Sequence, residues 1–344
     1  MKLDENNMAD IALADGRTLN TQVLTYPIAP EDQCLLVDLY RTEWTSADYD
    51  WLKSMRGDYS DSLVIQSLIG KIDGIPAGTA SVNYPRRDPE IAVVGSVLTH
   101  PDFRRLRIAE HLTNAATDFA FAAGCKVAYL GAARIPTCIY LKCGYDWHNG
   151  GVMRCEADGC SECEQQFFRS DQETTIRSAC WGDLAGLACL VVQDLDCCVI
   201  DYPRGYLSGK YVSLERCVSN FSNIYDQVVA RGGVMKMLIG ERPHRVLGFG
   251  TLTPEPSPAR NHIAVLDVAA HDNYIDQLPQ LIETLKDEAR SAGIEKLQAY
   301  VADQDQAKSQ FLRHADLQPI ANLHGQLKID GRKMDVTVLE GPVR

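Results

Sequence analysis

The sequence lacks two features that would place the protein at a membrane or on nucleic acid. No stretch approaches the roughly 18 uninterrupted apolar residues of a membrane-spanning helix, and the segment from Met1 to Asp10 is polar and acidic, unlike a signal peptide. Positive charge is also scarce: 34 lysines and arginines stand against 46 aspartates and glutamates, a formal net charge of −12. That balance disfavours binding to nucleic acid or anionic lipid and is compatible with a cationic substrate. We therefore expect a cytoplasmic protein with neither a nucleic-acid nor a membrane partner.

The cysteines lack the pattern of a secreted or zinc-binding protein. Several of the 12 stand in apolar surroundings, for example Cys125 and Cys189, which is typical of reduced core residues and not of a disulfide framework. Cys160 and Cys163 have partial zinc-ligand spacing, but no second close pair and no His-x-His follows them. We expect no metal site.

The length and an internal repeat predict two domains. At 344 residues the chain exceeds the usual size of one domain, and residues 91–100 align with residues 262–271 within the same order of elements. Antiparallel hairpins come first in each copy, and strands alternate with helices only later. Each copy is therefore predicted to be an α+β fold, a mixed, mostly antiparallel, twisted sheet flanked by helices. We place the first domain at 1–156, a polar linker at 157–170 and the second domain at 171–344.

Turn residues and hydrophobic periodicity give the expected elements. In the first domain they are strands at 11–13, 18–24, 63–72, 75–84, 91–99, 127–130, 145–147 and 152–155, and helices at 30–43, 48–55, 109–124 and 135–143. In the second they are strands at 174–179, 234–239, 246–252, 262–269, 296–301, 323–329 and 334–339, and helices at 183–193, 276–292 and 304–314. The stretch 201–231 is an insertion of ambiguous structure.

The first copy carries a predicted anion site. A buried strand ending at Thr99 runs into a loop that contains Arg104, Arg105 and Arg107, and an amphipathic helix begins near Ala109. Loop amides and the first N–H groups of a helix point the same way, and the helix dipole adds roughly half a positive charge. The arginines beside them complete a site for a phosphate-like anion.

The residues around this loop resemble the GNAT superfamily of acyl-CoA-dependent N-acyltransferases. The family's loop pattern Arg/Gln-x-x-Gly-x-Gly/Ala is occupied by the residues from Arg104 to Ala109, after the lead-in that begins at His100. The family's later Tyr-x-Lys-x-Gly-Phe/Tyr signature stands at Tyr140 to Tyr145, at the usual separation. The resemblance implies two tandem GNAT folds and acetyl-CoA as cosubstrate.

The resemblance also implies residue roles. Amides from Arg105 to Ala109 would hold the pyrophosphate, and Val97 and Thr99 would hydrogen-bond the pantetheine arm. Tyr140 would protonate the departing thiolate, which suits a phenol of pKa about 10; the alternative is a tyrosine that packs the core. The expected cofactor-binding residues are Val97, Leu98, Thr99, Arg104, Arg105, Leu106, Arg107, Ile108, Ala109 and Lys142.

One position departs from the family pattern. Arg107 replaces the central glycine, which lets the backbone approach the pyrophosphate closely. An arginine there costs about 1 kcal/mol or more if its φ must be positive. Its guanidinium can compensate by binding a phosphate.

An amine acceptor must reach the thioester unprotonated, so a general base is needed. Glu90, at the start of the central strand, is the first candidate, followed by Asp88 and His148. A solvated carboxylate at the end of a strand is the alternative interpretation of Glu90.

The second copy departs much further from the pattern. Its corresponding loop, from His271 to Asp276, carries no arginine and places two carboxylates where phosphates would lie. Leu312 stands where Tyr140 does in the first copy. We predict that this copy does not bind CoA and that it serves packing, closure of the acceptor pocket or homodimerisation.

The predicted function is transfer of an acetyl group from acetyl-CoA to the amine of a small molecule, by direct attack in a ternary complex. Acetylation of a protein or peptide amine is a second interpretation. A non-catalytic acyl-CoA-binding sensor is a third.

Overall fold

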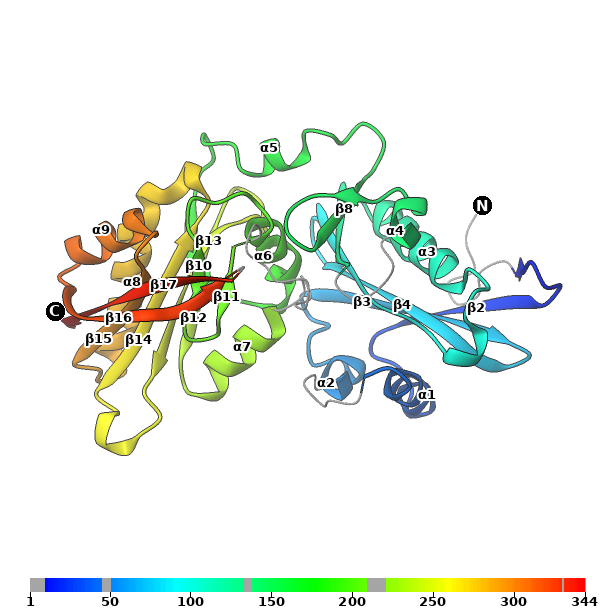
Figure 1. Ribbon diagram of the computed structural model, residues 1–344, viewed down its shortest axis with the longest axis horizontal. Coiled ribbons are helices and arrows are strands. Elements are labelled where there is room, and N and C mark those ends of the chain that lie inside the picture. Colours follow the sequence, from blue (N-terminus) through cyan, green and yellow to red (C-terminus); the bar gives the residue numbers. More distant parts are fainter. Residues whose placement is uncertain (1–9, 45–50, 133–137, 209–220, 330, 344) are drawn as a thin grey trace. The chain divides into compact units, whose positions relative to one another are not determined.

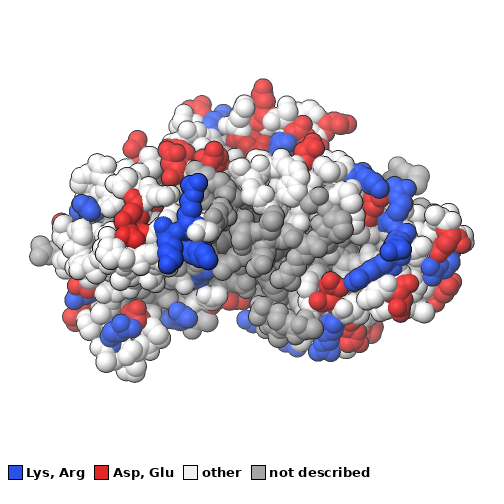
Figure 2. Space-filling model, viewed as in Figure 1, with Lys and Arg blue, Asp and Glu red and all other residues white. Residues whose placement is uncertain are grey.

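The computed structural model describes residues 10–44, 51–132, 138–208, 221–329 and 331–343 (Figure 1). The chain divides into two compact units, and the main division falls between Cys163 and Glu164. Among the described residues, no helix is both long and apolar enough to cross a membrane. Acidic and basic side chains are interspersed on the face seen in Figure 2.

The first unit is built on one mixed sheet with the order β1-β2-β3-β4-β5-β6-β8-β7. Its strands are β1 (Ile11–Ala12), β2 (Thr18–Thr25), β3 (Leu63–Ile72), β4 (Ile75–Pro85), β5 (Ile91–Thr99), β6 (Val127–Gly131), β7 (Asp146–Trp147) and β8 (Val152–Glu156). Every neighbouring pair is antiparallel except β5 and β6, which are parallel.

Helices cover both faces of this sheet. Figure 1 shows α3 (Ile108–Ala122) and α4 (Cys138–Lys142) on one face, and α1 (Pro30–Arg41) and α2 (Trp51–Arg56) on the other. The apolar stripe of α3, with Leu112, Ala116 and Ala120 fully buried, packs on β3, β4 and β5. Gly70 permits the close approach, because a Cβ at that position would come within 3.4 Å of the Leu112 side chain. This packing fixes the end of β5 relative to the start of α3.

The second unit has a mixed sheet with the order β16-β17-β15-β14-β13-β12-β9. Its strands are β9 (Thr175–Ser178), β12 (Val234–Ile239), β13 (Val246–Pro254), β14 (Ile263–Ala270), β15 (Lys296–Ala302), β16 (Gln318–Ile329) and β17 (Arg332–Pro342). A separate ribbon pairs β10 (Val199–Asp201) with β11 (Tyr206–Leu207). The helices are α6 (Leu184–Val191), α7 (Phe221–Ala230), α8 (Leu278–Ser291) and α9 (Gln306–His314), and α5 (Cys163–Phe167) lies at the division between the units.

The two sheets share one strand order. Read from β2 to β7, the first sheet runs 2-3-4-5-6-8-7, and the second runs 9-12-13-14-15-17-16 in the corresponding places. In both, the parallel pair is joined through a long helix, α3 or α8, and the next strand leads to a short helix, α4 or α9. The predicted fold class, α+β with mixed and mostly antiparallel sheets flanked by helices, is confirmed.

Several boundaries differ from the expected ones. Strand β16 begins at Gln318 and not at 323, because it pairs with β17 through two register shifts. The expected helix 276–292 begins at Leu278, after a 3₁₀ segment over Asp272–Gln277. The insertion 201–231 contains β11 and α7, while 209–220 lies outside the described residues. Of the expected helix 135–143, the described part is α4.

Candidate active site

Two parallel strands diverge in the centre of the first unit. Strand β5 pairs with β6 only from Ile91 to Val93, opposite Val127 to Tyr129. It then continues to Thr99, and beyond Val93 its pairing among the described residues is with β4. The β6-facing edge of β5 therefore presents backbone donors and acceptors that an extended ligand can bind as an added strand would.

A bulge lies in this free part of β5. Ser96 has a φ of +49°, and the register with β4 shifts between Thr79 and Ser81. A left-handed backbone at a residue other than glycine costs roughly 1–2 kcal/mol, and β-bulges are over-represented next to active sites because they redirect side chains. Val97 and Leu98, which follow the bulge, are buried.

The loop after β5 holds two arginines in the left-handed region. His100 caps a 3₁₀ turn (Pro101–Phe103) by accepting the Asp102 N–H at Nδ1, 3.3 Å away. Arg105 and Arg107 then have φ values of +69° and +63°, and α3 begins directly afterwards. Such strain persists only where the surrounding structure enforces it. The first N–H groups of α3 follow this turn directly, and the anion site expected there stays a prediction.

Arg107 takes the backbone conformation that glycine favours. Its Nε donates to Glu110 Oε2 at 2.9 Å, and a second contact joins Nη2 to Oε1, so the guanidinium lies over the first turn of α3. These hydrogen bonds hold the pKa of Glu110 below its usual value. The arginine thus keeps the glycine-like loop shape, and its side chain is directed along the helix.

The other predicted cofactor residues lie around the same loop. Leu98 and Ile108 are buried, and Leu106, Ala109 and Thr99 are partly buried. Arg104 and Arg105 are exposed; Arg104 Nη2 donates to Glu43 at 2.9 Å. Lys142 is exposed at the end of α4, which contacts α3.

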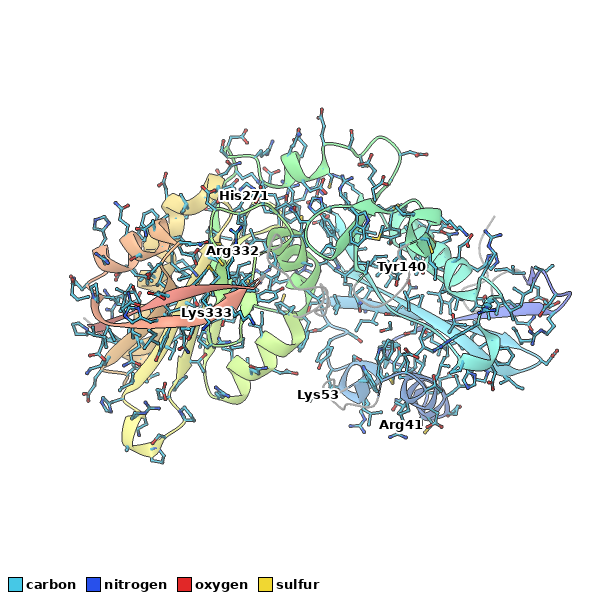
Figure 3. All side chains as sticks on the ribbon, in the orientation of Figure 1. Arg41, Lys53, Tyr140, His271, Arg332 and Lys333 are labelled. Atoms are coloured by element: carbon cyan, nitrogen blue, oxygen red, sulfur yellow. The ribbon has the colours of Figure 1, made fainter. Side chains whose placement is uncertain are left out.

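Tyr140 lies inside the first unit, beside α3 and α4 (Figure 3). It is 2% exposed and packs edge-on against Tyr145, with ring centroids 6.4 Å apart. The Tyr145 hydroxyl shares a 2.7 Å hydrogen bond with Thr117 on α3. Gly144, with a φ of +78°, ends the helix and returns the chain to the sheet. The signature therefore fixes α4 against α3, and the acid role of Tyr140 stays a prediction.

Glu90 lies at the opposite end of β5 from the loop. It is 6% exposed and forms a 3.0 Å ion pair with Lys126. The strand from Glu90 to Thr99 spans about 30 Å at roughly 3.3 Å per residue. Its carboxylate already has a cation beside it, which disfavours a role as proton acceptor near the loop. Asp88 is exposed, and the ring of His148 packs on Tyr129, 5.7 Å between centroids.

Sequence reasoning missed a buried group of hydroxyls beside the bulge. The Tyr26 hydroxyl lies 2.9 Å from Ser67 Oγ, and Tyr40 on α1 has Ser96, Ser67 and Thr79 around its hydroxyl. Burial raises the pKa of both tyrosines, so they remain neutral phenols. The five residues come from five separate segments, so no local pattern in the sequence could reveal them.

The corresponding place in the second unit is filled by the chain itself. Strand β14 pairs with β15 only from Ile263 to Val265 and then diverges from it. Asp305, before α9, accepts the N–H groups of Cys198 at 2.6 Å and Val199 at 3.0 Å. The segment 198–202, which we call the internal strap, therefore lies against the diverging strands.

Buried charges hold the internal strap against β14 and α9, and an aromatic stack joins it to β15. Lys308 Nζ donates to the Val199 carbonyl at 2.6 Å and to Asp267 of β14 at 2.8 Å. Asp267 also accepts the Tyr202 N–H at 2.7 Å. On the other side the Tyr202 ring stacks on Tyr300 of β15, with centroids 4.9 Å apart. The strap therefore lies beside the part of β14 that corresponds to the part of β5 beyond Val93.

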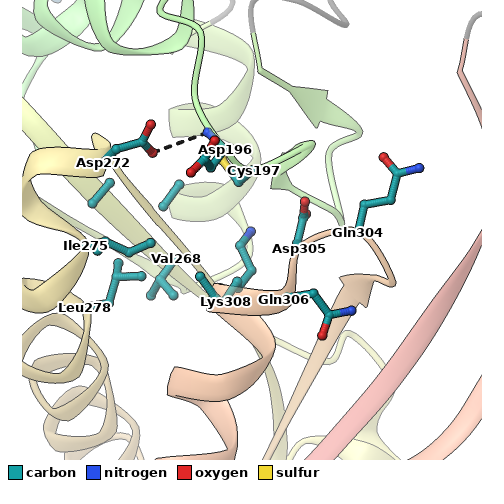
Figure 4. Close-up of a pocket in the computed structure, with 13 residues that line it drawn as sticks. Asp196, Cys197, Val268, Asp272, Ile275, Leu278, Gln304, Asp305, Gln306 and Lys308 are labelled. Carbon is teal, nitrogen blue, oxygen red and sulfur yellow. Dashed lines mark hydrogen bonds between the residues drawn. The ribbon is translucent and has the colours of Figure 1, made fainter.

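A cavity of about 310 Å³ remains beside the strap, at the carboxyl end of β14. Ala269, Ala270, Ile275 and Leu278 form its apolar wall. Figure 4 shows the Asp196 N–H donating to Asp272 Oδ1, a distance of 3.3 Å, at its rim. The rim of this cavity is acidic, whereas the corresponding loop of the first unit is rich in arginine.

Comparison with models of known protein families finds a match to one segment of the chain. Residues 35–145 match the model of the acetyltransferase (GNAT) family, a segment that contains β5, the arginine loop, α3 and Tyr140. The matched segment is thus similar to GNAT acetyltransferases, and the match supports an acyltransferase. None of the curated proteins compared with the chain matches it.

Several solved acetyltransferases resemble half of the chain. An N-acetyltransferase from Staphylococcus aureus Mu50 has a TM-score of 0.41 and 16% identity, covering 50% of this chain and 99% of its own. The ribosomal-protein-alanine N-acetyltransferase from Brucella melitensis has a TM-score of 0.40 and 19% identity, covering 49% and 99%. A GNAT superfamily phosphinothricin acetyltransferase from Sinorhizobium meliloti, solved in complex with AcCoA, has a TM-score of 0.40 and 12% identity, covering 49% and 88%.

Proposed function

We propose that the first unit transfers an acetyl group from acetyl-CoA to the amine of a small molecule. The observation that carries the proposal is the left-handed backbone of Arg105 and Arg107, directly before α3, within the GNAT-matched segment. A residue with a Cβ disfavours this backbone conformation, yet both arginines adopt it. The resulting loop has the shape and polarity that a pyrophosphate requires.

The cofactor residues have separable tasks in this proposal. Amides from Arg105 to Ala109 hold the pyrophosphate, with Arg104 and Arg105 supplying positive charge around it. The open edge of β5 at Val97 and Thr99 binds the pantetheine arm. Leu98 and Ile108, both buried, anchor the loop at its two ends, with Leu106 between them and Lys142 on the adjacent helix.

The reaction is a direct transfer. The amine attacks the thioester carbonyl carbon, so a C–N bond forms, the C–S bond breaks and CoA leaves as a thiolate. Tyr140 donates the proton that the thiolate takes up. The amine must lose a proton to a base; Glu90 is the predicted base, and its ion pair with Lys126 argues against it.

The second unit is proposed to be a degenerate GNAT-like domain that does not bind CoA. Its internal strap covers the edge that pantetheine would need, and its loop carries Asp272 and Asp276 but no arginine. The proposed domains remain 1–156 and 171–344, joined by 157–170. One CoA site per chain follows.

Calorimetric titration of the whole chain with CoA and acetyl-CoA tests the proposal. We expect about one equivalent bound per chain, and turnover with acetyl-CoA on a panel of small amines that includes polyamines, amino acids and aminoglycosides. Absence of binding would refute the proposal. Binding without turnover would favour an acyl-CoA sensor, and faster turnover of peptide amines would reassign the acceptor.

A further inference from the structure

The second unit contains a cluster of reactive side chains away from the internal strap. Arg177 comes from β9, Cys180 and Asp183 from the start of the helical segment that continues into α6, and His244 from the turn between β12 and β13. The ligand atoms of Cys180, Asp183 and His244 all lie within 4.8 Å of one another. No part of the proposed acetyl transfer uses them.

Asp183 is the centre of this cluster. Its carboxylate is fully buried and accepts two hydrogen bonds from Arg177, at 2.8 and 2.6 Å. It lies 3.0 Å from His244 Nδ1 and also accepts the Cys180 N–H at 2.9 Å. Although burial disfavours its charged form, the hydrogen bonds from Arg177 and His244 hold the pKa of Asp183 below its usual value. The carboxylate is therefore ionised and has four donors around it.

The cluster contains more positive than negative charge. Burial works against a charged imidazole, but the hydrogen bonds to Asp183 and to the Cys180 sulfur raise the pKa of His244 to about 9. At neutral pH two cations, Arg177 and His244, thus face one carboxylate. The Cys180 sulfur lies beside both cations.

The Cys180 sulfur is surrounded by donors. It accepts the Asp183 N–H at the start of the helical segment, and Arg177 Nη1 lies 3.8 Å from it. A cysteine at a helix N-terminus and beside cationic side chains is the environment of a nucleophilic thiol, since each donor favours negative charge on sulfur. Cys180 is also partly exposed, so a small reagent can reach it.

The same three side chains do not form a metal site. Arg177 already donates to both oxygens of Asp183, and a protonated imidazole has no lone pair for a metal. A divalent cation would have to displace the guanidinium and deprotonate His244.

We propose that Cys180 is a nucleophilic thiol and the site at which small soft electrophiles modify this protein. With an α-iodoacetamide the sulfur attacks the methylene carbon, an S–C bond forms, the C–I bond breaks and iodide leaves. The thiol proton passes to solvent. The proposal stands independently of acetyl transfer by the first unit.

Two exposed cysteines of the same chain provide internal controls. Cys34 on α1 and Cys138 on α4 are exposed, and neither shares the cluster. The intact protein is treated with iodoacetamide at pH 7 for increasing times, and the labelled peptides are quantified by mass spectrometry. We expect Cys180 to react about tenfold faster than either control, although it is less exposed. Equal or slower labelling of Cys180 would overturn the proposal.

Variants of the two cations separate reactivity from accessibility. In His244→Gln the labelling rate of Cys180 should fall toward that of Cys34, whose own rate should not change. Arg177→Lys, which keeps a positive charge, should have a smaller effect. An unchanged Cys180 rate in His244→Gln would overturn the assigned cause; if that variant misfolds, the comparison of the three cysteines in the wild-type chain remains decisive.

Discussion

The diverging parallel strands of the two units have the same topology and opposite surroundings. In the first unit β5 leaves β6 after Val93 and, within the described ranges, pairs beyond that point with β4 alone, whereas in the second unit the internal strap is fastened against β14. The comparison teaches that one arrangement of strands can accommodate different neighbours. In the second unit that neighbour is the chain's own strap, held beside β14 through the side chains of Asp267 and Lys308.

Two aligned residues, Ser96 and Asp267, show where the two copies differ in structure. Ser96 of β5 has a left-handed backbone and interrupts the register with β4. Asp267, its counterpart in β14, lies in an unbroken register with β13 and binds Lys308 and the strap. Strand β5 is therefore bent at Ser96, whereas β14 is regular at Asp267 and is held there by Lys308.

The loops after these strands begin alike and then separate. His271 accepts the Asn273 N–H at 3.2 Å, as His100 accepts that of Asp102. The first loop then places Arg105 and Arg107 in left-handed conformations, while the second continues as a 3₁₀ segment into α8. The shared histidine cap is a feature of the fold, and the left-handed arginines are a feature of the site.

The largest expected effect comes from breaking the internal strap's anchor. Lys308→Met leaves Asp267 and Asp305 buried without their cation, which should lower the free energy of unfolding of the second unit by roughly 3–5 kcal/mol. Urea denaturation followed by circular dichroism measures this. The affinity of the first unit for CoA should stay unchanged; a matching loss of CoA binding would show that the two copies are not functionally separate.

Removing the predicted acid should affect turnover next. Tyr140→Phe keeps the ring that packs on Tyr145 and should lower kcat by roughly 10- to 10³-fold, with KM for acetyl-CoA little changed. Steady-state kinetics measure both constants. Leu312→Ala, at the equivalent place in the second unit, is the matched control and should leave kcat unaltered. An unaltered kcat in Tyr140→Phe would leave the tyrosine a packing role alone.

The histidine cap of the second unit should respond to acid. Burial lowers the pKa of His271, stacked on Phe168, to about 4. Because the unfolded chain binds this proton near pH 6.5, stability is complete above that pH and is lost as the pH falls toward 4. We expect roughly 1–2 kcal/mol, after allowance for partial exposure. Unfolding curves between pH 4 and 7 should be flatter for His271→Gln than for wild type, and a variant as acid-sensitive as wild type would contradict the assignment.

Loss of one loop arginine should weaken CoA binding modestly. Arg104→Ala removes an exposed positive charge and should raise the Kd roughly three- to tenfold, with a dependence on salt concentration. Asp272→Asn and Asp276→Asn in the second loop are the controls and should leave the Kd unchanged. If they alter it as much as Arg104→Ala does, CoA does not bind in the first unit alone.

The smallest effect concerns the departure from the family pattern. Arg107→Gly relieves the left-handed strain but adds backbone entropy and removes the ion pair with Glu110, so the net stability change should stay within about 1 kcal/mol. Arg107→Ala keeps the strain and loses the pair, so it should be less stable than the glycine variant. Calorimetry should find less than about a threefold change in the Kd of CoA for Arg107→Gly, because amides form the site; a larger rise would assign the phosphate to the guanidinium.

Local sequence features predicted much of this molecule. Hydrophobic periodicity gave β5 and α3 to within a residue at their shared loop, and the turn residues gave the β3–β4 and β12–β13 hairpins. Boundaries failed where pairing at long range decides them: β16 starts at Gln318 because β17 holds it there, through residues that carry no local strand signal. The buried hydroxyls around Tyr40 were beyond reach for the same reason.

By itself, the sequence determined the arginine loop, the helix behind it and the repeat of elements, because turn chemistry and amphipathic spacing act between near neighbours. Only the tertiary structure decided what surrounds them. It placed the backbone of Arg107 in a conformation typical of glycine and paired its guanidinium with Glu110. It also buried Tyr140 under α3 and held the strap beside β14 through Lys308. These outcomes depend on contacts between distant segments, whose free energy arises only when the sheets are assembled.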